Sequence, residues 1–581
     1  MNKLIWNLNE LFKDNQAFYK EIINVYNLTK SLEINYKDIE LNPNSLLELL
    51  EKEWLIKEKS NNILIYGSLM YYKDINNEEC IKLKKEAEKT NNEINTSLKF
   101  IDRKILDLGL DNINNFINKQ QKLEIYKHSL YNLFRLNEHI TNDEINKKIQ
   151  ENNNTINEEL TKYNKLLKDI TYGYIEINNE KIELNSSNII KYLSSENREI
   201  RKQTYFNVNK SFKKYENNFA SILNLIYKKR IENSNLEKYN SVLEKVLFEE
   251  NINPLIIEKL INIVNNKTYL IQSYLDIKFN LFKIKDPHLY DFNIKLNNNL
   301  KTYSLEEAKE IILKALKPLG KEYIKVVKIL LNGHIDAELN ENKHQSITFS
   351  WNTYSFLNFK GSYVDLKNLI HEIGHIVNYY LSSKKQPFIY EDSTIFVGEI
   401  ASIVNEILLN RYLYNNANNN EEKILYLSKE IENYFTSIFK QVMYTEYENK
   451  IYSLSNKQDL TPDILSENYI NIIKKYYGNN IIYDNITNIE WTRLGHLYRW
   501  SYYPYKYATG LLLASLVVDS LIDKKTLSKE DYINFLSKGS SNYSLELLKI
   551  LNIDLINTNI IENGFNVLSN DIDKLKKLLL K

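Results

Sequence analysis

Cysteine, proline and glycine are scarce in this chain of 581 residues, which has one, seven and 13 of them. Because Cys80 is the single cysteine, no intramolecular disulfide and no cysteine metal cluster can form, as is typical of proteins from a reducing cytosol. The scarcity of proline and glycine leaves long stretches without helix breakers. The sequence therefore permits a protein built from long helices.

The chain also lacks an excess of charge and a long hydrophobic run. Lys and Arg number 76 and Asp and Glu 75, so the net charge of +1 gives no reason to expect nucleic acid or an anionic membrane as a partner. Acidic residues interleave with the lysine-rich stretches, which predicts solvated faces. The longest apolar run, Leu511 to Val518, is too short to span a bilayer, and Met1 to Trp6 contain no signal-peptide core. We expect a soluble, cytoplasmic protein.

Apolar residues recur at helical spacing along most of the chain, which predicts a mainly α fold. A chain of this length can form two or more domains with large cores. No internal repeat is visible, and composition by itself marks no domain boundary. The most periodic stretches are Leu46 to Trp54, Glu244 to Val264 and Leu305 to Leu316.

The most informative segment is His371-Glu372-Ile373-Gly374-His375. Residues four apart lie on one face of a helix, so both imidazoles can reach one metal ion. Glu372 would then lie beside a zinc-bound water and act as the general base of peptide hydrolysis. With eight histidines in the chain, the pattern arises by chance in about one chain in a hundred. It predicts a zinc site on a helix from Tyr363 to Leu381.

Gly374, between the two histidine turns, has two interpretations. Within a helix it costs about 1 kcal/mol relative to alanine. Either its missing side chain lets another element approach near the metal, or it is a tolerated helix glycine.

A peptidase zinc needs a third protein ligand. Ser393-Thr394 could cap a second helix on which Glu399, Ser402 and Glu406 share a face. Burying two carboxylates on an otherwise apolar helix costs free energy unless a metal ion or a hydrogen-bond donor faces them. We therefore take Glu399 as the third ligand and Glu406 as the acceptor for a ligand histidine's other N–H. A solvated helix face remains the alternative for both.

The segment from Tyr363 to Glu406 resembles the oligoendopeptidase F branch of the thimet-type (M3) metallopeptidases. In thermolysin-type and aminopeptidase-type enzymes the third glutamate is closer to the second histidine, where this chain has Thr394 and Ile395. The resemblance is carried by the zinc helix, Gln386-Pro387-Phe388, Thr394 to Glu399 and Asn405-Glu406, together with Trp6 to Phe12 and Asn197 to Lys202.

This resemblance implies a two-domain helical oligopeptidase with a zincin-like catalytic core, a small β-sheet and a deep substrate channel. Residues 1–195 would form an N-terminal helical domain that covers the channel, and residues 196–581 the zinc metallopeptidase domain. It also implies one Zn2+ per chain and short, unstructured oligopeptides as substrates. The oligomeric state stays open.

The resemblance also assigns stabilisation of the oxyanion to a histidine followed by tyrosines. We carry this role onto His496, Tyr498, Tyr502 and Tyr505. The three tyrosines share one face if the segment is helical, although Pro504 disturbs such a helix. Phenol hydroxyls are protonated at neutral pH and can donate hydrogen bonds. We interpret the neighbouring Tyr503 and Tyr507 as packing residues.

Two short strands are predicted before the zinc helix, at Ser346 to Ser350 and Thr353 to Phe359. An exposed strand edge there could pair with an extended peptide, or the two strands could form a plain hairpin against the helix. We expect Phe356, Asn358 and Gly361 to bind substrate.

The predicted function is that of a zinc endopeptidase in which Glu372 deprotonates the zinc-bound water and passes the proton to the leaving amine. A helical metallo-carboxypeptidase and a catalytically idle peptide-binding relative are the alternatives. A carboxypeptidase would need a basic residue that captures the free carboxylate of the peptide.

Overall fold

The chain is described from a computed structural model, over residues 4–139, 141–296 and 301–580. The chain packs into two units, and neither is a continuous segment. The expected boundary at residues 195 and 196 falls inside the second unit, and the expected division into domains stays a prediction. Unit 1 consists of Met1–Ile140, Lys301–Leu409 and Lys524–Asn552, and unit 2 of Thr141–Leu300, Asn410–Asp523 and Ile553–Lys581.

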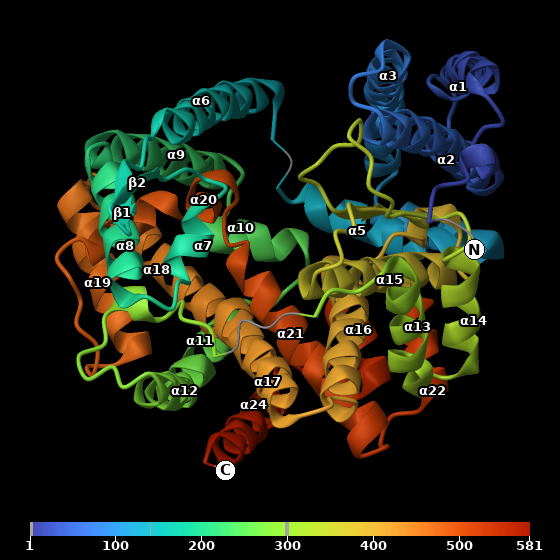
Figure 1. Ribbon diagram of the computed structural model, residues 1–581. Coiled ribbons are helices and arrows are strands. Elements are labelled where there is room, and N and C mark those ends of the chain that lie inside the picture. Colours follow the sequence, from blue (N-terminus) through green and yellow to red (C-terminus); the bar gives the residue numbers. More distant parts are fainter. Residues whose placement is uncertain (1–3, 140, 297–300, 581) are drawn as a thin grey trace. The chain divides into compact units, whose positions relative to one another are not determined.

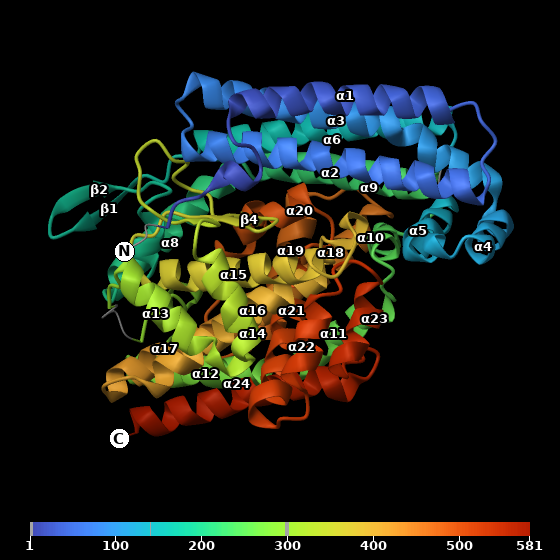
Figure 2. The same cartoon turned by 90° about the vertical axis from the view of Figure 1, so that its right-hand side faces the viewer.

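Three long helices lie side by side in unit 1 (Figures 1 and 2). The second begins after Asn42, whose side chain accepts hydrogen bonds from the backbone N–H groups of Asn44 and Ser45, with Pro43 at its first position. Leucines and isoleucines at helical spacing form their common core. These helices are α1 (Asn15–Tyr36), α2 (Pro43–Lys73) and α3 (Glu78–Leu108), followed by α4 (Leu110–Lys119) and α5 (Lys127–Asn137).

The rest of unit 1 packs around α15 (Tyr363–Ser383). A three-stranded sheet in the order β3-β5-β4 lies against this helix, with β5 parallel to β3 and antiparallel to β4. The strands are β3 (Ile335–Asp336), β4 (Phe349–Trp351) and β5 (Tyr354–Phe356). The remaining helices are α13 (Leu305–Ala315), α14 (Lys321–Leu330), α16 (Ile395–Asn415, mostly in this unit), α22 (Lys529–Leu536) and α23 (Ser544–Leu548).

Unit 2 is a bundle of helices in which α6 packs on α9, α17 on α24, and α18 on both α19 and α21. One hairpin, β1 (Tyr174–Ile177) and β2 (Glu180–Glu183), turns at Asn178-Asn179, where both residues have the positive φ that a tight hairpin turn requires. The helices are α6 (Asp143–Asp169), α7 (Ile189–Leu193), α8 (Arg198–Lys213), α9 (Glu216–Leu236), α10 (Val242–Glu249), α11 (Leu255–Asn266), α12 (Thr268–Leu281), α17 (Asn420–Tyr434), α18 (Lys440–Ser455), α19 (Pro462–Tyr477), α20 (Gly495–Arg499), α21 (Pro504–Val518) and α24 (Thr558–Leu579).

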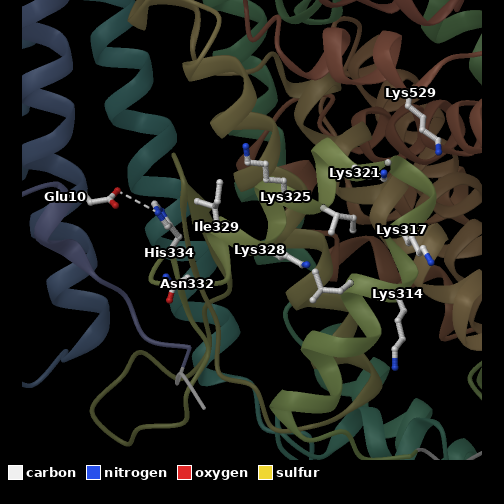
Figure 3. Close-up of a pocket in the computed structure, with 13 residues that line it drawn as sticks. Glu10, Lys314, Lys317, Lys321, Lys325, Lys328, Ile329, Asn332, His334 and Lys529 are labelled. Atoms are coloured by element: carbon white, nitrogen blue, oxygen red, sulfur yellow. Dashed lines mark ion pairs between the residues drawn. The ribbon is translucent and has the colours of Figure 1, made fainter.

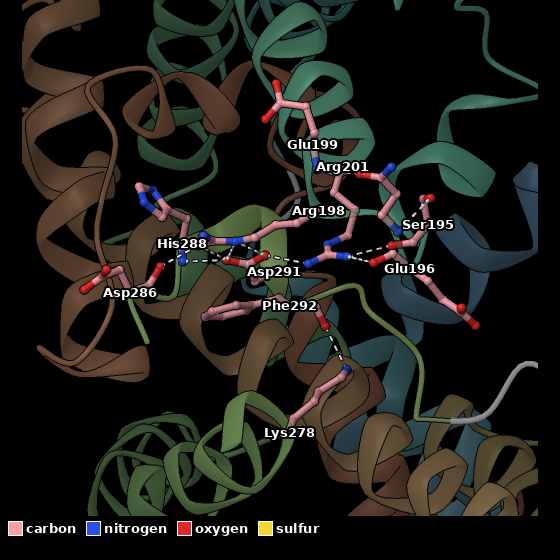
Figure 4. A network of polar contacts seen from close by, with 11 residues as sticks. Ser195, Glu196, Arg198, Glu199, Arg201, Lys278, Asp286, His288, Asp291 and Phe292 are labelled. Atoms are coloured by element: carbon pink, nitrogen blue, oxygen red, sulfur yellow. Dashed lines mark hydrogen bonds and ion pairs between the residues drawn. The ribbon is translucent and has the colours of Figure 1, made fainter. Parts of the chain in front are cut away.

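The Asn197 to Lys202 motif begins α8 and builds a buried ion-pair network (Figure 4). The guanidinium groups of Arg198 and Arg201 lie 2.9 and 2.7 Å from the carboxylate of Asp291. Burial by itself would raise the pKa of Asp291, but hydrogen bonds from both arginines and a backbone N–H lower it. This part of the motif therefore holds the start of α8 to the segment around Asp291.

Among the described residues, one helical stretch, Pro504–Asp523, is long and apolar enough to cross a bilayer. However, 72% of the apolar 18-residue part of this stretch is buried inside the protein. It packs against α18 and α24, so its apolar character is that of a core helix.

The periodic stretches predicted as helices are helical, with different limits. The Leu46 to Trp54 stretch is part of the much longer α2. The stretch from Glu244 to Val264 is divided between α10 and α11, because Pro254 stands at the start of the second helix. The predicted mainly α fold is confirmed.

Candidate active site

The candidate metal-binding motif lies on α15, as predicted. Ser362 begins this helix by accepting a hydrogen bond from the backbone N–H of Asp365, whose side chain accepts one from the backbone N–H of Ser362 in return. The helix then continues without a break to Ser383. His371 and His375 are thereby placed one turn apart on the same face.

The imidazoles of His371 and His375 point at the same position. Their Nε2 atoms lie only 3.1 Å apart. Two nitrogen ligands of one tetrahedral zinc are about 3.3 Å apart, given Zn–N bonds of about 2.0 Å. A carboxylate oxygen of Glu399 completes a group in which all ligand atoms lie within 4.8 Å of one another. Two imidazoles and one carboxylate are a donor set that fits zinc with room for a further ligand.

Gly374 allows the helix that carries Glu399 to approach so closely. A Cβ atom at position 374 would lie 2.4 Å from Cα of Ser402 and 2.7 Å from the carbonyl oxygen of Ala401. The backbones of α15 and α16 therefore touch at this point. The interpretation of Gly374 as a point of close approach is confirmed.

Glu406 lies behind His371. Its Oε1 is 2.6 Å from Nδ1 of His371, and its Oε2 is 2.9 Å from Nζ of Lys367. Burial opposes ionisation of Glu406, but Lys367 and His371 outweigh it and lower the pKa of its carboxyl to about 2. A carboxylate that is ionised at neutral pH accepts the Nδ1–H of His371 and so directs Nε2 toward the position that His375 also faces.

Asn405 holds α16 in register with its neighbours. Its amide donates a hydrogen bond to the carbonyl oxygen of Ile370 at 3.2 Å, and it accepts one from the hydroxyl of Tyr323 at 2.8 Å. Tyr323 is fully buried on α14. Asn405 thus connects α14, α15 and α16 directly beside Glu406.

Glu372, the candidate base, is 7% exposed. Burial raises the pKa of its carboxyl, which is the direction that makes a carboxylate a better proton acceptor. The hydroxyl of Ser350 on β4 donates a short hydrogen bond to Oε2 of Glu372. Sequence reasoning missed Ser350, because a strand pattern predicts alternation but does not say which polar side chain faces a distant helix.

The two predicted strands exist as β4 and β5, but their expected role changes. Phe356 is 0% exposed and packs with Trp6, Ile65 and Leu69, so its side chain is not available to a substrate. Strand β5 already has a partner on each side, which leaves β4 and β3 as the edges of this sheet. A peptide could add only at one of these edges.

Asn358 and Gly361 are used in positioning the loop before α15. The Asn358 amide donates to the carbonyl oxygen of His344 at 2.9 Å. Gly361 accepts a 2.8 Å hydrogen bond from the backbone N–H of Tyr303 and has a φ of 89°, where a side chain would be strained. Their contact with substrate stays a prediction.

In unit 2 the segment after His496 is not one continuous helix. α20 ends at Arg499, Tyr502 has a left-handed φ of 52°, and α21 starts at Pro504. The expectation that Tyr498, Tyr502 and Tyr505 share a helical face is therefore not met.

All three of these tyrosines lie in the interior. Tyr498 stacks on Tyr163 at 4.0 Å between ring centroids, and Tyr502 stacks on Tyr452 at 5.3 Å. The hydroxyl of Tyr505 lies 3.3 Å from Glu250. Burial raises the pKa of each of these phenols, so all three remain protonated.

His496 instead has Tyr503 and Tyr507 as aromatic neighbours. Its ring lies parallel to that of Tyr503 at 6.2 Å and edge-on to that of Tyr507 at 6.0 Å. Trp500, 53% exposed, contacts both His496 and Tyr503. Tyr507 is 37% exposed, in contrast to the buried Tyr498, Tyr502 and Tyr505. The two tyrosines interpreted as packing residues are thus the ones beside His496.

Known proteins resemble this chain along its whole length. The family model described as peptidase family M3 matches residues 191–567. The oligopeptidase PepF of Bacillus subtilis is 28% identical, over 99% of this chain and 87% of that protein. An oligoendopeptidase F homolog of Borreliella burgdorferi is also 28% identical, over 99% of this chain and 98% of its own length.

Solved structures show the same fold. A crystal structure described as that of a peptidase from Chlamydophila abortus superimposes with a TM-score of 0.91 and is 28% identical, covering 99% of this chain and 98% of that one. Oligoendopeptidase F of Enterococcus faecium has a TM-score of 0.72 and 22% identity, over 97% of this chain and 99% of that one. The second similarity concerns the fold only.

Proposed function

The chain belongs to peptidase family M3, and on that premise we propose that it cleaves internal bonds of short oligopeptides with one zinc ion held by His371, His375 and Glu399. As a member of this family it is a metalloendopeptidase that acts on oligopeptides. The observation that carries the choice of ligands is the convergence of the two Nε2 atoms, 3.1 Å apart, with Glu406 on the opposite nitrogen of His371. This arrangement directs the Nε2 atoms of both imidazoles toward one position where a cation could bind.

Zinc, when bound, would act as a Lewis acid toward the substrate carbonyl and would lower the pKa of the attacking water. Glu372 would take the proton that this water loses as its oxygen bonds to the carbonyl carbon. Glu372 would then donate the same proton to the amine as the C–N bond breaks, so it ends the cycle ionised. Ser350 would hold the carboxylate of Glu372 in one orientation through its hydrogen bond to Oε2.

His496 with tyrosine hydroxyls is the proposed donor group for the oxyanion. The sequence resemblance supports His496. Its ring contacts with Tyr503 and Tyr507 favour these two tyrosines as further donors over the three that the resemblance suggested. A donor must be able to reach the substrate, and Tyr507 is 37% exposed while Tyr498 is 0% exposed. We expect Tyr507→Phe to lower kcat by about tenfold or more, and Tyr498→Phe to leave it within about twofold. Equal losses for both variants would contradict this choice.

The central test compares Glu372→Gln with the native chain on an internally quenched peptide whose two ends are blocked. We expect cleavage to fall by at least about a thousandfold while zinc content, measured by mass spectrometry, stays at one per chain. Cleavage of the blocked peptide by the native chain would also exclude a carboxypeptidase, which needs a free carboxylate.

Glu391→Gln is the matched control for this test. Glu391 is also a partly buried carboxyl with a raised pKa, but it accepts a hydrogen bond from Tyr379 at 2.7 Å and is outside the ligand set. It should retain both activity and zinc. Full activity of a zinc-loaded Glu372→Gln chain would refute the proposed base.

A further inference from the structure

A hollow of about 1050 Å3 on unit 1 has a strongly one-sided charge (Figure 3). Six lysines line it, against a single carboxylate, Glu10, which lies at the far end beside His334. The whole chain is close to neutral, with a net charge of +1. The hollow is therefore a local concentration of positive charge. Its lysines are solvent-exposed, as the prediction of solvated faces requires, but only one carboxylate lines the hollow with them. The lysines are Lys314, Lys317, Lys321, Lys325, Lys328 and Lys529.

The fold brings these lysines together through the spacing along α14 and through the packing of α13 and α22 beside it. Lys321, Lys325 and Lys328 recur at four- and three-residue steps, so they form one face of α14. Gly320, with a φ of 101°, allows the sharp connection between the end of α13 and α14. The stem of Lys529 on α22 packs against Gly320, since a Cβ there would lie 3.2 Å from its Cδ.

These ammonium groups have few partners within the protein. Lys314 pairs with Glu310 at 3.2 Å. In the part of the chain that the structure describes, the other five lysines form no ion pair with a carboxylate. Some lysines elsewhere on unit 1 do form one, as Lys309 does with Glu306 at 2.8 Å. Five neighbouring unpaired cations attract a ligand that carries several negative charges.

The lining indicates which kind of polyanion fits. Leu313, Ile324 and Ile329 supply apolar surface between the lysines, and Ile329 is 39% exposed. The lining contains no arginine, tyrosine, phenylalanine or tryptophan, the side chains on which single-stranded nucleic acids stack. The surface is also concave, whereas a membrane requires a surface that can lie on a plane. Lysine ammonium groups act as point charges and suit carboxylates without a fixed geometry.

We infer that this lysine hollow is a docking site for an acidic protein segment in which glutamates or aspartates flank an apolar side chain. The carboxylates would pair with Lys317, Lys321, Lys325, Lys328 and Lys529, and the apolar side chain would lie on Ile324 and Ile329. The site does not depend on the proposed zinc chemistry, because none of the lining residues belongs to the metal site.

The test measures fluorescence anisotropy with the full chain and a fluorescein-labelled probe peptide of glutamates with leucine at every fourth position. Mass spectrometry confirms that the probe stays intact. We expect binding that weakens about tenfold between about 0.05 M and about 0.3 M salt. The variant Lys321→Glu/Lys325→Glu/Lys328→Glu should weaken binding by a further tenfold or more, since each pairing becomes a repulsion.

The matched control is the triple variant Lys20→Glu/Lys30→Glu/Lys89→Glu. It changes the net charge equally at three exposed lysines of α1 and α3, outside the hollow. Its binding should stay within about twofold of the native chain. If thermal unfolding shows that the variant with Lys321, Lys325 and Lys328 changed to Glu is not folded, the variant with the same three lysines changed to Gln replaces it. We expect this neutral variant to bind the probe peptide about threefold more weakly than the native chain. Hydrolysis of a neutral quenched peptide should be unchanged in either triple, which separates this site from the zinc site.

Equal binding by the native and lysine-reversed chains, or equal loss in the control, would overturn the inference. Oligouridylate and vesicles with an anionic lipid are the competing probes. Tighter binding of either one through the same three lysines would overturn the assignment to an acidic protein segment.

Discussion

Oε1 of Glu406 lies 2.6 Å from Nδ1 of His371, on the nitrogen opposite to the one that faces His375. This relationship fixes both the tautomer and the orientation of a proposed zinc ligand from a helix more than thirty residues further along the chain. It also accounts for a buried carboxylate on an otherwise apolar helix, since Lys367 and His371 together neutralise it.

Removal of Glu406 should therefore weaken the metal site without removing a ligand. We expect Glu406→Ala to lower zinc affinity about 10- to 100-fold, measured by competition with a fluorescent chelator, and to regain part of its activity in excess zinc. Glu406→Gln should show a smaller loss, because an amide oxygen still accepts from Nδ1–H. Unchanged zinc affinity in Glu406→Ala would show that Glu406 is merely a structural partner of Lys367.

The two glycines near the metal site should respond oppositely to alanine. Gly374→Ala places a methyl group 2.4 Å from Cα of Ser402, so the helices must separate, and we expect a loss of about 2–3 kcal/mol in the free energy of unfolding. Gly398→Ala meets nothing nearer than Nδ1 of His375 at 3.8 Å and should be neutral or stabilising by up to about 1 kcal/mol. Denaturant titration of both variants measures the difference. Similar stabilities would contradict the close approach of α15 and α16.

Ser350 should influence catalysis through Glu372. We expect Ser350→Ala to lower kcat by about tenfold with little change in KM, and Ser350→Thr to restore most of it, because only the hydroxyl is needed. Ser355→Ala is the matched control. Ser355 pairs with Ser350 across the sheet, and its buried hydroxyl has no hydrogen-bond partner among the described residues. A similar loss of kcat in both variants would point to a general effect on the strands.

Glu448 should make the stability of unit 2 fall as pH rises from acid to about 8. Glu448 is fully buried, and its Oε1 accepts a hydrogen bond from the backbone N–H of Tyr502 at 2.9 Å. Its Oε2 has no hydrogen-bond partner among the described residues. Burial raises the pKa of its carboxyl from 4.5 to about 8. The folded state therefore keeps a proton that the unfolded chain releases, so stability falls as pH rises from about 4.5 to 8.

Glu448→Gln removes this titration and should flatten the dependence of the melting temperature on pH in that window. Glu446→Gln, which loses a carboxylate paired with Lys475 at 2.6 Å, should keep the native pH dependence. An unchanged pH profile in Glu448→Gln would refute the assignment.

Much of the candidate metal site could be proposed from the sequence, because its geometry rests on local spacing. Two histidines four residues apart on an apolar helix share a face whatever surrounds them, and Glu399 and Glu406 follow from the cost of burying carboxylates. Helical periodicity similarly determined the mainly α fold, although Pro254 divided one predicted helix into two.

The tertiary structure decided what depends on partners distant in the sequence. Sequence periodicity did not show that Ser350 would face Glu372 or that Phe356 would be buried. It also did not show the left-handed backbone at Tyr502, after which Tyr503 and Tyr507 lie beside His496. The lysines of the hollow come from α13, the short turn after it, α14 and α22, so the pattern of charge along the chain concealed their clustering. Spacing determines which side chains share a face, whereas packing determines what that face meets.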